Sequence, residues 1–103
     1  MLFFVKARIK IKELSPEELW EIWETESEAA RKATEAGKLL AAYKVSGMRM
    51  VLGLLEVESH DELDRILSTL PMVRYIEFEE ILPIRPFDNF ANDLKNRWKS
   101  DAN

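Results

Sequence analysis

The chain has 103 residues and a mass of 12.0 kDa, which suffices for one domain and little more. Hydrophobic residues make up 47% and charged residues 33%, which is ordinary for a globular protein and excludes a disordered or fibrous chain. A net charge of −4 without a block of lysine and arginine excludes the usual electrostatic footprint of nucleic-acid binding, and the lack of cysteine excludes a disulfide framework and thiolate chemistry.

The first twelve residues alternate between apolar and other side chains with a period of two, which indicates a strand with one buried face. Lysine and arginine alternate along the other face and suit a solvated strand surface. The stretch is too short for the hydrophobic part of a secretory signal, and no segment is apolar enough to span a membrane. We therefore expect a soluble, cytoplasmic protein. The apolar face comprises Met1, Phe3, Val5, Ala7, Ile9 and Ile11.

A helix is predicted from Pro16 to about Ala36. Ser15 is suited to be its N-cap and Glu18 stands three residues later, so the two form a capping box with a proline at the first helical position. Gly37 is expected to end this helix, because glycine readily adopts the positive φ of a C-terminal cap.

Two strands are predicted next, over residues 38–46 and 48–57, with Gly47 in the turn between them. This pattern indicates an antiparallel pair. The second strand is apolar on both faces, and a strand of this kind needs cover on both sides. We therefore expect the face of the sheet that carries no helices to pack on another sheet, most simply in a homodimer.

A second helix is predicted over about residues 60–69, opened by a capping box of Ser59 and Glu62 and ended by Pro71. From residue 74 to residue 83 the chain again alternates as a strand, and prolines close it. The residues predicted to share one face of this strand are Ile76, Phe78 and Leu82.

In chain order the elements read βαββαβ, the split βαβ arrangement of ferredoxin-like folds. This α+β fold has two helices on one face of a four-stranded antiparallel sheet. We predict one such domain over residues 1–88 and a tail over residues 89–103. Apolar residues recur every four positions in the tail, at Phe90, Leu94 and Trp98, which predicts a helix that docks on the body or on a neighbouring subunit. A frayed tail is the alternative.

Glu26 is the candidate catalytic residue, because it falls in the middle of the apolar stripe of the first helix. A carboxylate that faces a core must be paired, hydrogen-bonded or protonated, and desolvation raises its pKa toward the range useful for proton transfer. The structural alternative is an ion pair with Lys6 or Arg8, or a side chain that reaches solvent. Small residues on the same stripe leave space for a ligand; they are Ala29, Ala30 and Ala33.

Four further residues are candidates for ligand binding. Tyr43, Tyr75 and Arg49 carry donors that could stabilise an oxygen gaining charge when a neighbouring carbon loses its proton. Trp23 suits the wall of an apolar site. Each has a packing or surface role as its alternative. With one histidine and three separated glycines, the sequence contains neither a metal constellation nor a phosphate loop, so we expect no metal and no cofactor.

Several segments together resemble the muconolactone isomerase family: MLFFV at the start, AGK after the first helix, the KVSG turn, DEL in the second helix and LSTLPMVRYIEFEEILPIRP near the end. The resemblance covers about residues 1–88. It implies ferredoxin-like subunits that pair through their sheets as a dimeric α+β barrel and assemble into rings of dimers, up to a decamer. It also implies an isomerase of aromatic catabolism that shifts a double bond of a lactone by moving a proton, without metal or organic cofactor. The family carries a glutamate at the place of Glu26.

Four positions depart from the pattern of that family. Phe4, which the resemblance places at the ligand site, stands where the family has histidine. Val51 and Gly53 replace Asn and Ser, and Arg85 replaces the histidine of the closing His-Pro. Two alternatives therefore stay open, a non-catalytic oligomer that binds a small ligand and a cofactor-free monooxygenase of the same architecture. We expect muconolactone itself to be a poor substrate, and neither nucleic acid nor membrane to be a partner.

Overall fold

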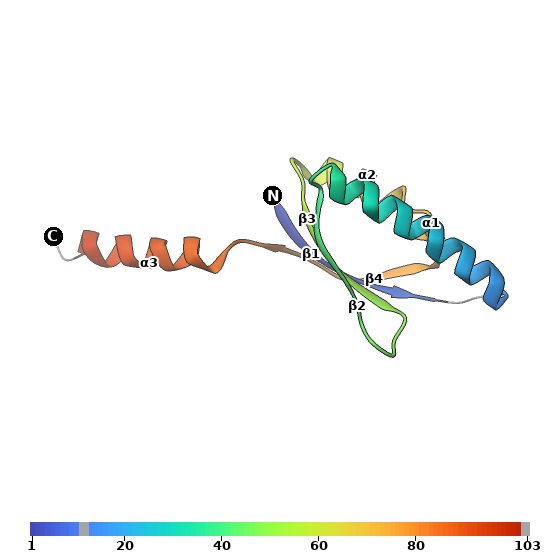
Figure 1. The fold of residues 1–103 in the computed structure, drawn as a ribbon. Coiled ribbons are helices and arrows are strands. Elements are labelled where there is room, and N and C mark those ends of the chain that lie inside the picture. Colours follow the sequence, from blue (N-terminus) through green and yellow to red (C-terminus); the bar gives the residue numbers. More distant parts are fainter. Residues whose placement is uncertain (11–12, 102–103) are drawn as a thin grey trace.

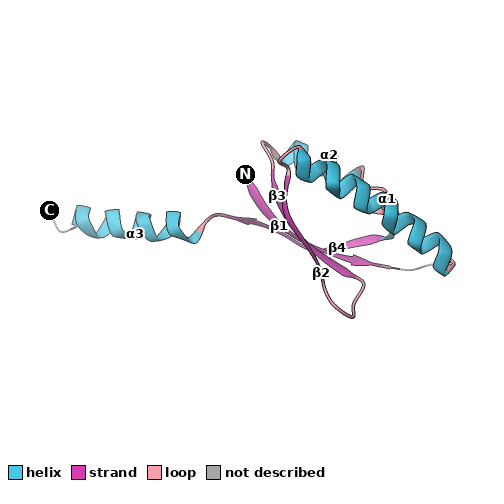
Figure 2. Ribbon diagram, in the orientation of Figure 1, coloured by secondary structure: helices cyan, strands magenta, loops and turns pink. Residues whose placement is uncertain are grey.

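The structure, a computed structural model, describes residues 1–10 and 13–101, with side chains as far as residue 97. Within these residues the chain forms four strands, three α-helices and one short 3₁₀ helix (Figure 1, Figure 2). None of the described helices is long and apolar enough to cross a membrane. The elements are β1 (Leu2–Ile9), α1 (Pro16–Glu35), β2 (Leu39–Lys44), β3 (Met50–Glu56), α2 (His60–Ser68), η1 (Val73–Tyr75), β4 (Ile76–Ile84) and α3 (Phe87–Asp101).

The strands form one antiparallel sheet in the order β2-β3-β1-β4, and α1 and α2 lie over one of its faces (Figure 1). The predicted βαββαβ order and α+β fold are confirmed. Between the central strands, Phe3 lies opposite Leu55 and Val5 lies opposite Gly53. Opposite residues share a face of the sheet, so the odd-numbered residues of β1 and β3 point toward the helices.

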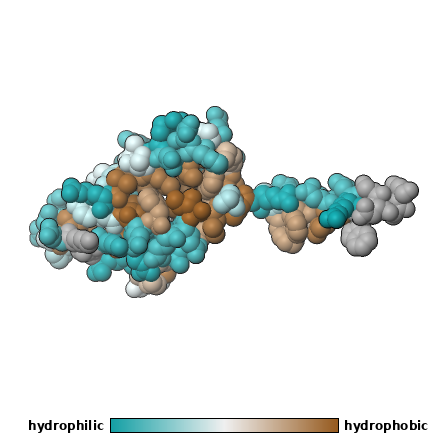
Figure 3. Space-filling view, turned by 180° about the vertical axis from the view of Figure 1, so that it is seen from behind, coloured by the Kyte–Doolittle hydropathy of each residue, from teal (hydrophilic) through white to brown (hydrophobic). Residues whose placement is uncertain are grey.

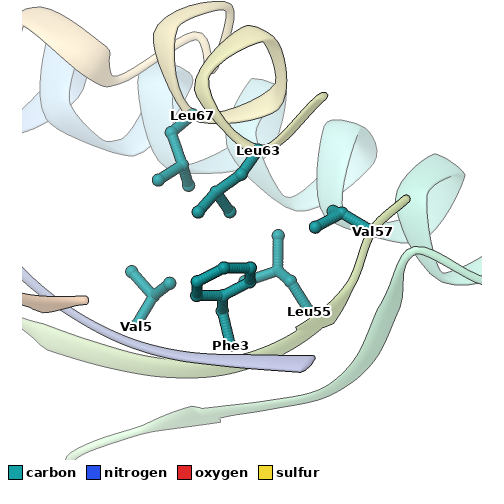
Figure 4. Packing of buried hydrophobic residues seen from close by; sticks show 6 residues of the cluster. All are labelled: Phe3, Val5, Leu55, Val57, Leu63 and Leu67. Carbon is teal, nitrogen blue, oxygen red and sulfur yellow. The ribbon is translucent and has the colours of Figure 1, made fainter. Parts of the chain in front are cut away.

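The main core lies between α2 and the central strands. Phe3, Val5 and Leu55 rise from the sheet toward Leu63 and Leu67 of α2, and all five side chains are buried (Figure 4). By contrast, α1 contributes no buried residue, although it has 20 residues and lies over the same face. Its apolar stripe is only half covered. The space beneath α1 is therefore less completely filled than the space beneath α2.

The ends of α1 follow the prediction. The Ser15 hydroxyl accepts a hydrogen bond from the Glu18 N–H, and the Glu18 carboxylate accepts one from the Ser15 N–H, each at 3.1 Å. After the helix, Gly37 has a φ of 75°, a conformation that glycine adopts without strain. The strands on either side of Gly47 are shorter than predicted, and the predicted strand positions 11 and 12 lie outside the described residues.

The start of α2 forms only half of the predicted capping box. The Ser59 hydroxyl accepts a hydrogen bond from the Glu62 N–H at 3.0 Å. The Glu62 carboxylate does not return to the Ser59 N–H; it accepts one from the Glu58 N–H at 3.3 Å and pairs with the Lys38 ammonium at 2.9 Å. The nearby ammonium lowers the pKa of Glu62 through this hydrogen bond. A charged partner from the residue just before β2 thus competes with the reciprocal cap.

Removal of the remaining cap gives a testable result. We expect Ser59→Ala to lower the free energy of unfolding by about 1 kcal/mol, because the Glu62 N–H at the helix start then loses its side-chain acceptor. Urea unfolding followed by circular dichroism measures this change, with Ser68→Ala at the other end of the helix as the control. An unchanged free energy of unfolding in Ser59→Ala would mean that water replaces the cap without loss.

The last strand differs from the prediction in two ways. Residues 73–75 form the 3₁₀ helix η1, so β4 begins at Ile76 instead of residue 74. A bulge at Glu79 interrupts the pairing with β1 and adds one residue to β4. Because side chains alternate between faces, one extra residue reverses the alternation beyond it. Phe78 faces the helices while Leu82 faces the other side, so the prediction that they share a face is wrong.

The second face of the sheet is left open by the described elements, and we call it the open face. One half of it is charged: Arg8 Nε lies 2.5 Å and Lys6 Nζ lies 3.7 Å from the Glu79 carboxylate. The other half is apolar, and Leu82 there is 46% exposed. The strand register assigns to this apolar half Leu2, Phe4, Leu52, Leu54, Leu82 and Ile84.

The C-terminal helix α3 projects away from the sheet and helices (Figure 1), which gives the molecule extents of 67 × 27 × 19 Å. Apolar surface is visible both on the body and on this projecting segment (Figure 3). Phe87 is 74% exposed, and Phe90 and Leu94 are exposed as well. The predicted helix is present, but it does not dock on its own body. The Trp98 side chain lies outside the described residues, and docking on a neighbour stays a prediction.

Candidate functional site

A cavity of about 270 Å³ lies between α1 and the helix-facing side of the sheet. Its walls are almost entirely apolar. From the sheet it is lined by Val5, Ala7, Ile9, Val51, Gly53 and Leu55, and from α1 by Trp23, Glu26, Ala29, Ala30 and Ala33. The predicted apolar stripe of α1 therefore faces the sheet, and Glu26 lies among its apolar and small residues.

Small residues on opposite walls leave the space that forms the cavity. Ala29, Ala30 and Ala33 line it from α1, and Gly53, which carries no side chain, lines it from β3. A Cβ built on Gly53 would meet its nearest neighbour, Leu39, at 3.6 Å, which is an ordinary van der Waals contact. Glycine is thus not forced by close approach at this position. Its effect is to leave room beneath α1.

Glu26 is the half-buried acid of this cavity. Its Oε2 accepts a hydrogen bond from the backbone N–H of Met72 at 3.0 Å, and Met72 is fully buried. Burial raises the pKa of the Glu26 carboxyl above its ordinary value, and the hydrogen bond from Met72 opposes this shift in part. The alternative of an ion pair with Lys6 or Arg8 is wrong, because both lie on the open face.

The raised pKa of Glu26 predicts the pH dependence of stability. The folded protein holds this proton more tightly than the unfolded chain, so the stabilisation is complete below the ordinary pKa of 4.5 and is lost as pH rises through the folded pKa. Glu26→Gln removes the effect. We therefore expect the variant to gain free energy of unfolding relative to wild type between pH 4 and pH 7, measured by urea unfolding. Glu24→Gln, exposed on the same helix, is the control; a difference that does not vary with pH would contradict the assignment.

Two of the predicted ligand-binding residues border the cavity. Trp23 lines it from α1 beside Glu26. Tyr43 borders it from the edge strand β2, but it lies opposite Leu52, so its side chain points to the open face and is 63% exposed. Sequence analysis missed Ser27 and Lys44, which also border it. The strand period contained a signal for Lys44, because a residue next to Tyr43 points to the other face of β2.

The other three predicted ligand-binding residues lie elsewhere. Phe4 is on the open face, since its neighbours Phe3 and Val5 point toward the helices. Arg49 is exposed between β2 and β3, and its carbonyl accepts a hydrogen bond from the Ile9 N–H at 2.8 Å. Tyr75 belongs to η1 and lines a separate polar depression. The structure therefore does not bring Phe4, Arg49 and Tyr75 together with Glu26.

Residues 1–90 match the protein family described as muconolactone delta-isomerase. The chain belongs to this family. A solved structure, the crystal structure of muconolactone isomerase at 3.3 Å resolution, is similar to it with a TM-score of 0.75 and 23% sequence identity. The similarity covers 84% of this chain and 90% of that one. Comparison with curated proteins gives no significant match.

Membership of the muconolactone delta-isomerase family agrees with the two-layered fold. The chemistry of the cavity depends on the side chains that this chain places there. The described residues contain no group of three or more side chains that could hold a metal ion. The charged side chains that border the cavity are Glu26 and Lys44. Glu26 is therefore the charged residue that α1 contributes to the cavity, and Lys44 is the one that β2 contributes.

Proposed function

We propose that this member of the muconolactone delta-isomerase family is a proton-transfer isomerase that acts on a small unsaturated lactone or a related oxygenated ring compound. The observation that carries the proposal is the position of Glu26, a carboxyl held in an apolar cavity. Its Oε2 is fixed by the Met72 N–H, while Oε1 has no hydrogen-bond partner among the described residues. One oxygen is thus oriented, and the other is available to a ligand.

The reaction requires one group that both removes and returns a proton. An ionised Glu26 takes a proton from a carbon next to the conjugated system of the ring, and the electron pair moves into that system. The protonated carboxyl then returns the proton to another carbon, which shifts the double bond and restores the base. A pKa raised toward neutrality serves both steps. The atoms and charges balance without an oxidant or a cofactor.

The working form is proposed to be a homodimer at least, formed through the open face. The apolar half of that face holds six apolar residues on neighbouring strands. A contiguous apolar patch of this kind is typical of an interaction surface and unusual on a sheet face that contacts only water. The charged half carries both signs, with Arg8 and Lys6 beside Glu79. A two-fold axis through such a face brings equal surfaces together and allows complementary pairing.

The projecting α3 supports association beyond this single face. Arg85 Nη1 lies 2.7 Å from Asp93 Oδ2, and the Arg85 guanidinium carbon lies 5.4 Å from the centroid of the Phe90 ring. These two contacts attach the first turns of α3 to the end of β4. Its apolar residues Phe87 and Leu94 nevertheless remain exposed. We propose that these residues pack on a second copy of the chain, since α3 does not pack on the sheet and helices of its own chain.

A deuterium-exchange assay tests the function. The protein is mixed with a butenolide, an unsaturated five-membered lactone, in deuterated buffer, and the ring protons are followed by NMR. We expect the protein to accelerate exchange at the carbons next to the conjugated system and to interconvert the double-bond isomers. Exchange no faster than in buffer, although the lactone binds, would reject the isomerase.

A non-catalytic ligand-binding protein is the second candidate, and one observation favours it. Arg49 and Tyr75, the donors expected to stabilise charge on a substrate oxygen, do not border the cavity. Tyr43 lies opposite Leu52, so its largely exposed phenol points to the open face. Binding without acceleration of exchange in the assay above would identify this second function.

A further inference from the structure

We infer that the cavity selects uncharged ring compounds and excludes ligands that carry a carboxylate. This inference rests on the proposed function, because it concerns the ligand of the same cavity. Its basis is the distribution of charge around the cavity, in which one acid lies inside and one base lies at the rim.

The inner wall offers no positive charge to an anionic ligand. Apart from Tyr43 and Lys44 of β2, the sheet side consists of aliphatic residues, alanines, Gly53 and Phe78, and the α2 side includes Ile66, Leu67 and Leu70. A carboxylate moved from water into such a wall loses its hydration without gaining a partner, which is strongly unfavourable. A neutral lactone or ester loses far less hydration at the same place.

The acid inside the cavity adds repulsion. Glu26 is half-buried beneath α1, and the hydrogen bond it accepts comes from an uncharged group, the Met72 N–H. A second carboxylate nearby would meet a like charge in a medium of low polarity, where charges interact more strongly than in water. The same carboxyl that serves a neutral ring as base or acid therefore disfavours an anionic one.

Lys44 does not reverse this balance. It is the last residue of β2 and lies opposite Val51, so its side chain leaves the sheet on the helix-facing side. The residue is exposed, and its ammonium donates a hydrogen bond to the Val45 carbonyl at 2.9 Å. A ligand carboxylate that reached Lys44 would remain at the solvent-exposed rim, where an ion pair contributes little.

The test compares two ligands that differ in one charge, muconolactone as its carboxylate and the methyl ester of muconolactone. Isothermal titration at neutral pH measures both dissociation constants for wild type and for Lys44→Gln. We expect the ester to bind at least about tenfold more tightly than the acid, a difference of roughly 1.4 kcal/mol. We expect Lys44→Gln to leave this ratio unchanged, whereas Glu26→Gln reduces it by removing the like charge.

The other outcomes separate the inference from the proposed function. If the acid binds as tightly as the ester and loses affinity in Lys44→Gln, Lys44 is a carboxylate anchor and the inference is overturned, while exchange of the ester protons can still support the isomerase. If neither compound binds at millimolar concentration, the ligand cavity itself is rejected, and the inference and the proposed function fall together.

Discussion

We expect Glu26→Gln to reduce proton exchange in the bound lactone by at least about 100-fold, the lower end of what a positioned acid or base contributes. Glutamine keeps the shape of the side chain, and its carbonyl oxygen can still accept the hydrogen bond from the Met72 N–H. It cannot take up and return a proton. The loss should therefore appear in the exchange rate, with the dissociation constant of the neutral ester little changed.

The matched control for this variant is Glu24→Gln, which makes the same chemical change on the exposed side of α1. Its exchange rate should equal that of wild type. Circular dichroism and thermal melts show whether each variant is folded. An active Glu26→Gln protein would mean that another group moves the proton, and an unfolded one would mean that the carboxylate is required for the fold.

Phe4→Glu is expected to break the proposed homodimer. Phe4 lies on the central strand β1 opposite Leu54 and Leu82, in the middle of the apolar half of the open face. A carboxylate there would be buried without a partner, and two-fold symmetry would place the charge in the interface from both subunits. We expect the dissociation constant of the dimer to rise by at least about 1,000-fold, equal to about 4 kcal/mol.

Sedimentation velocity over a range of concentrations measures this change. The control is Trp20→Glu, which introduces the same charge on α1 at a side chain that is 68% exposed, and it should leave the dimer intact. The proposal fails if wild type is a stable monomer at micromolar concentration, or if Phe4→Glu associates like wild type. In the first case the open face must be stable in contact with water.

The order of elements could be predicted because its signals are local. Ser15 with Glu18, and Gly37 after the helix, mark the ends of α1 within a few residues of sequence. The alternation in β1 predicted which residues meet the core. The bulge at Glu79 has no comparable signal in the sequence. One extra residue in a strand reads as part of a regular strand until the pairing with the partner strand is known.

Glu26 could be singled out because a charged residue inside an apolar stripe is visible in sequence. Its hydrogen-bond partner was not predictable, since the Met72 N–H is 46 residues away and belongs to the backbone, which no residue type reveals. The assignment of Phe4 to the ligand site had a different basis. Family resemblance suggested the ligand site, whereas the period of two already placed Phe4 on the face opposite to Phe3 and Val5.

Whether Glu26 is a cavity carboxyl suited to proton transfer can be measured by an NMR titration of the glutamate carboxyl carbons. Glu26→Gln assigns the resonance by its disappearance. We predict that the Glu26 pKa lies above its ordinary value of 4.5 and moves when the neutral lactone ester binds. A Glu26 pKa at or below 4.5 that does not respond to the ester would contradict it.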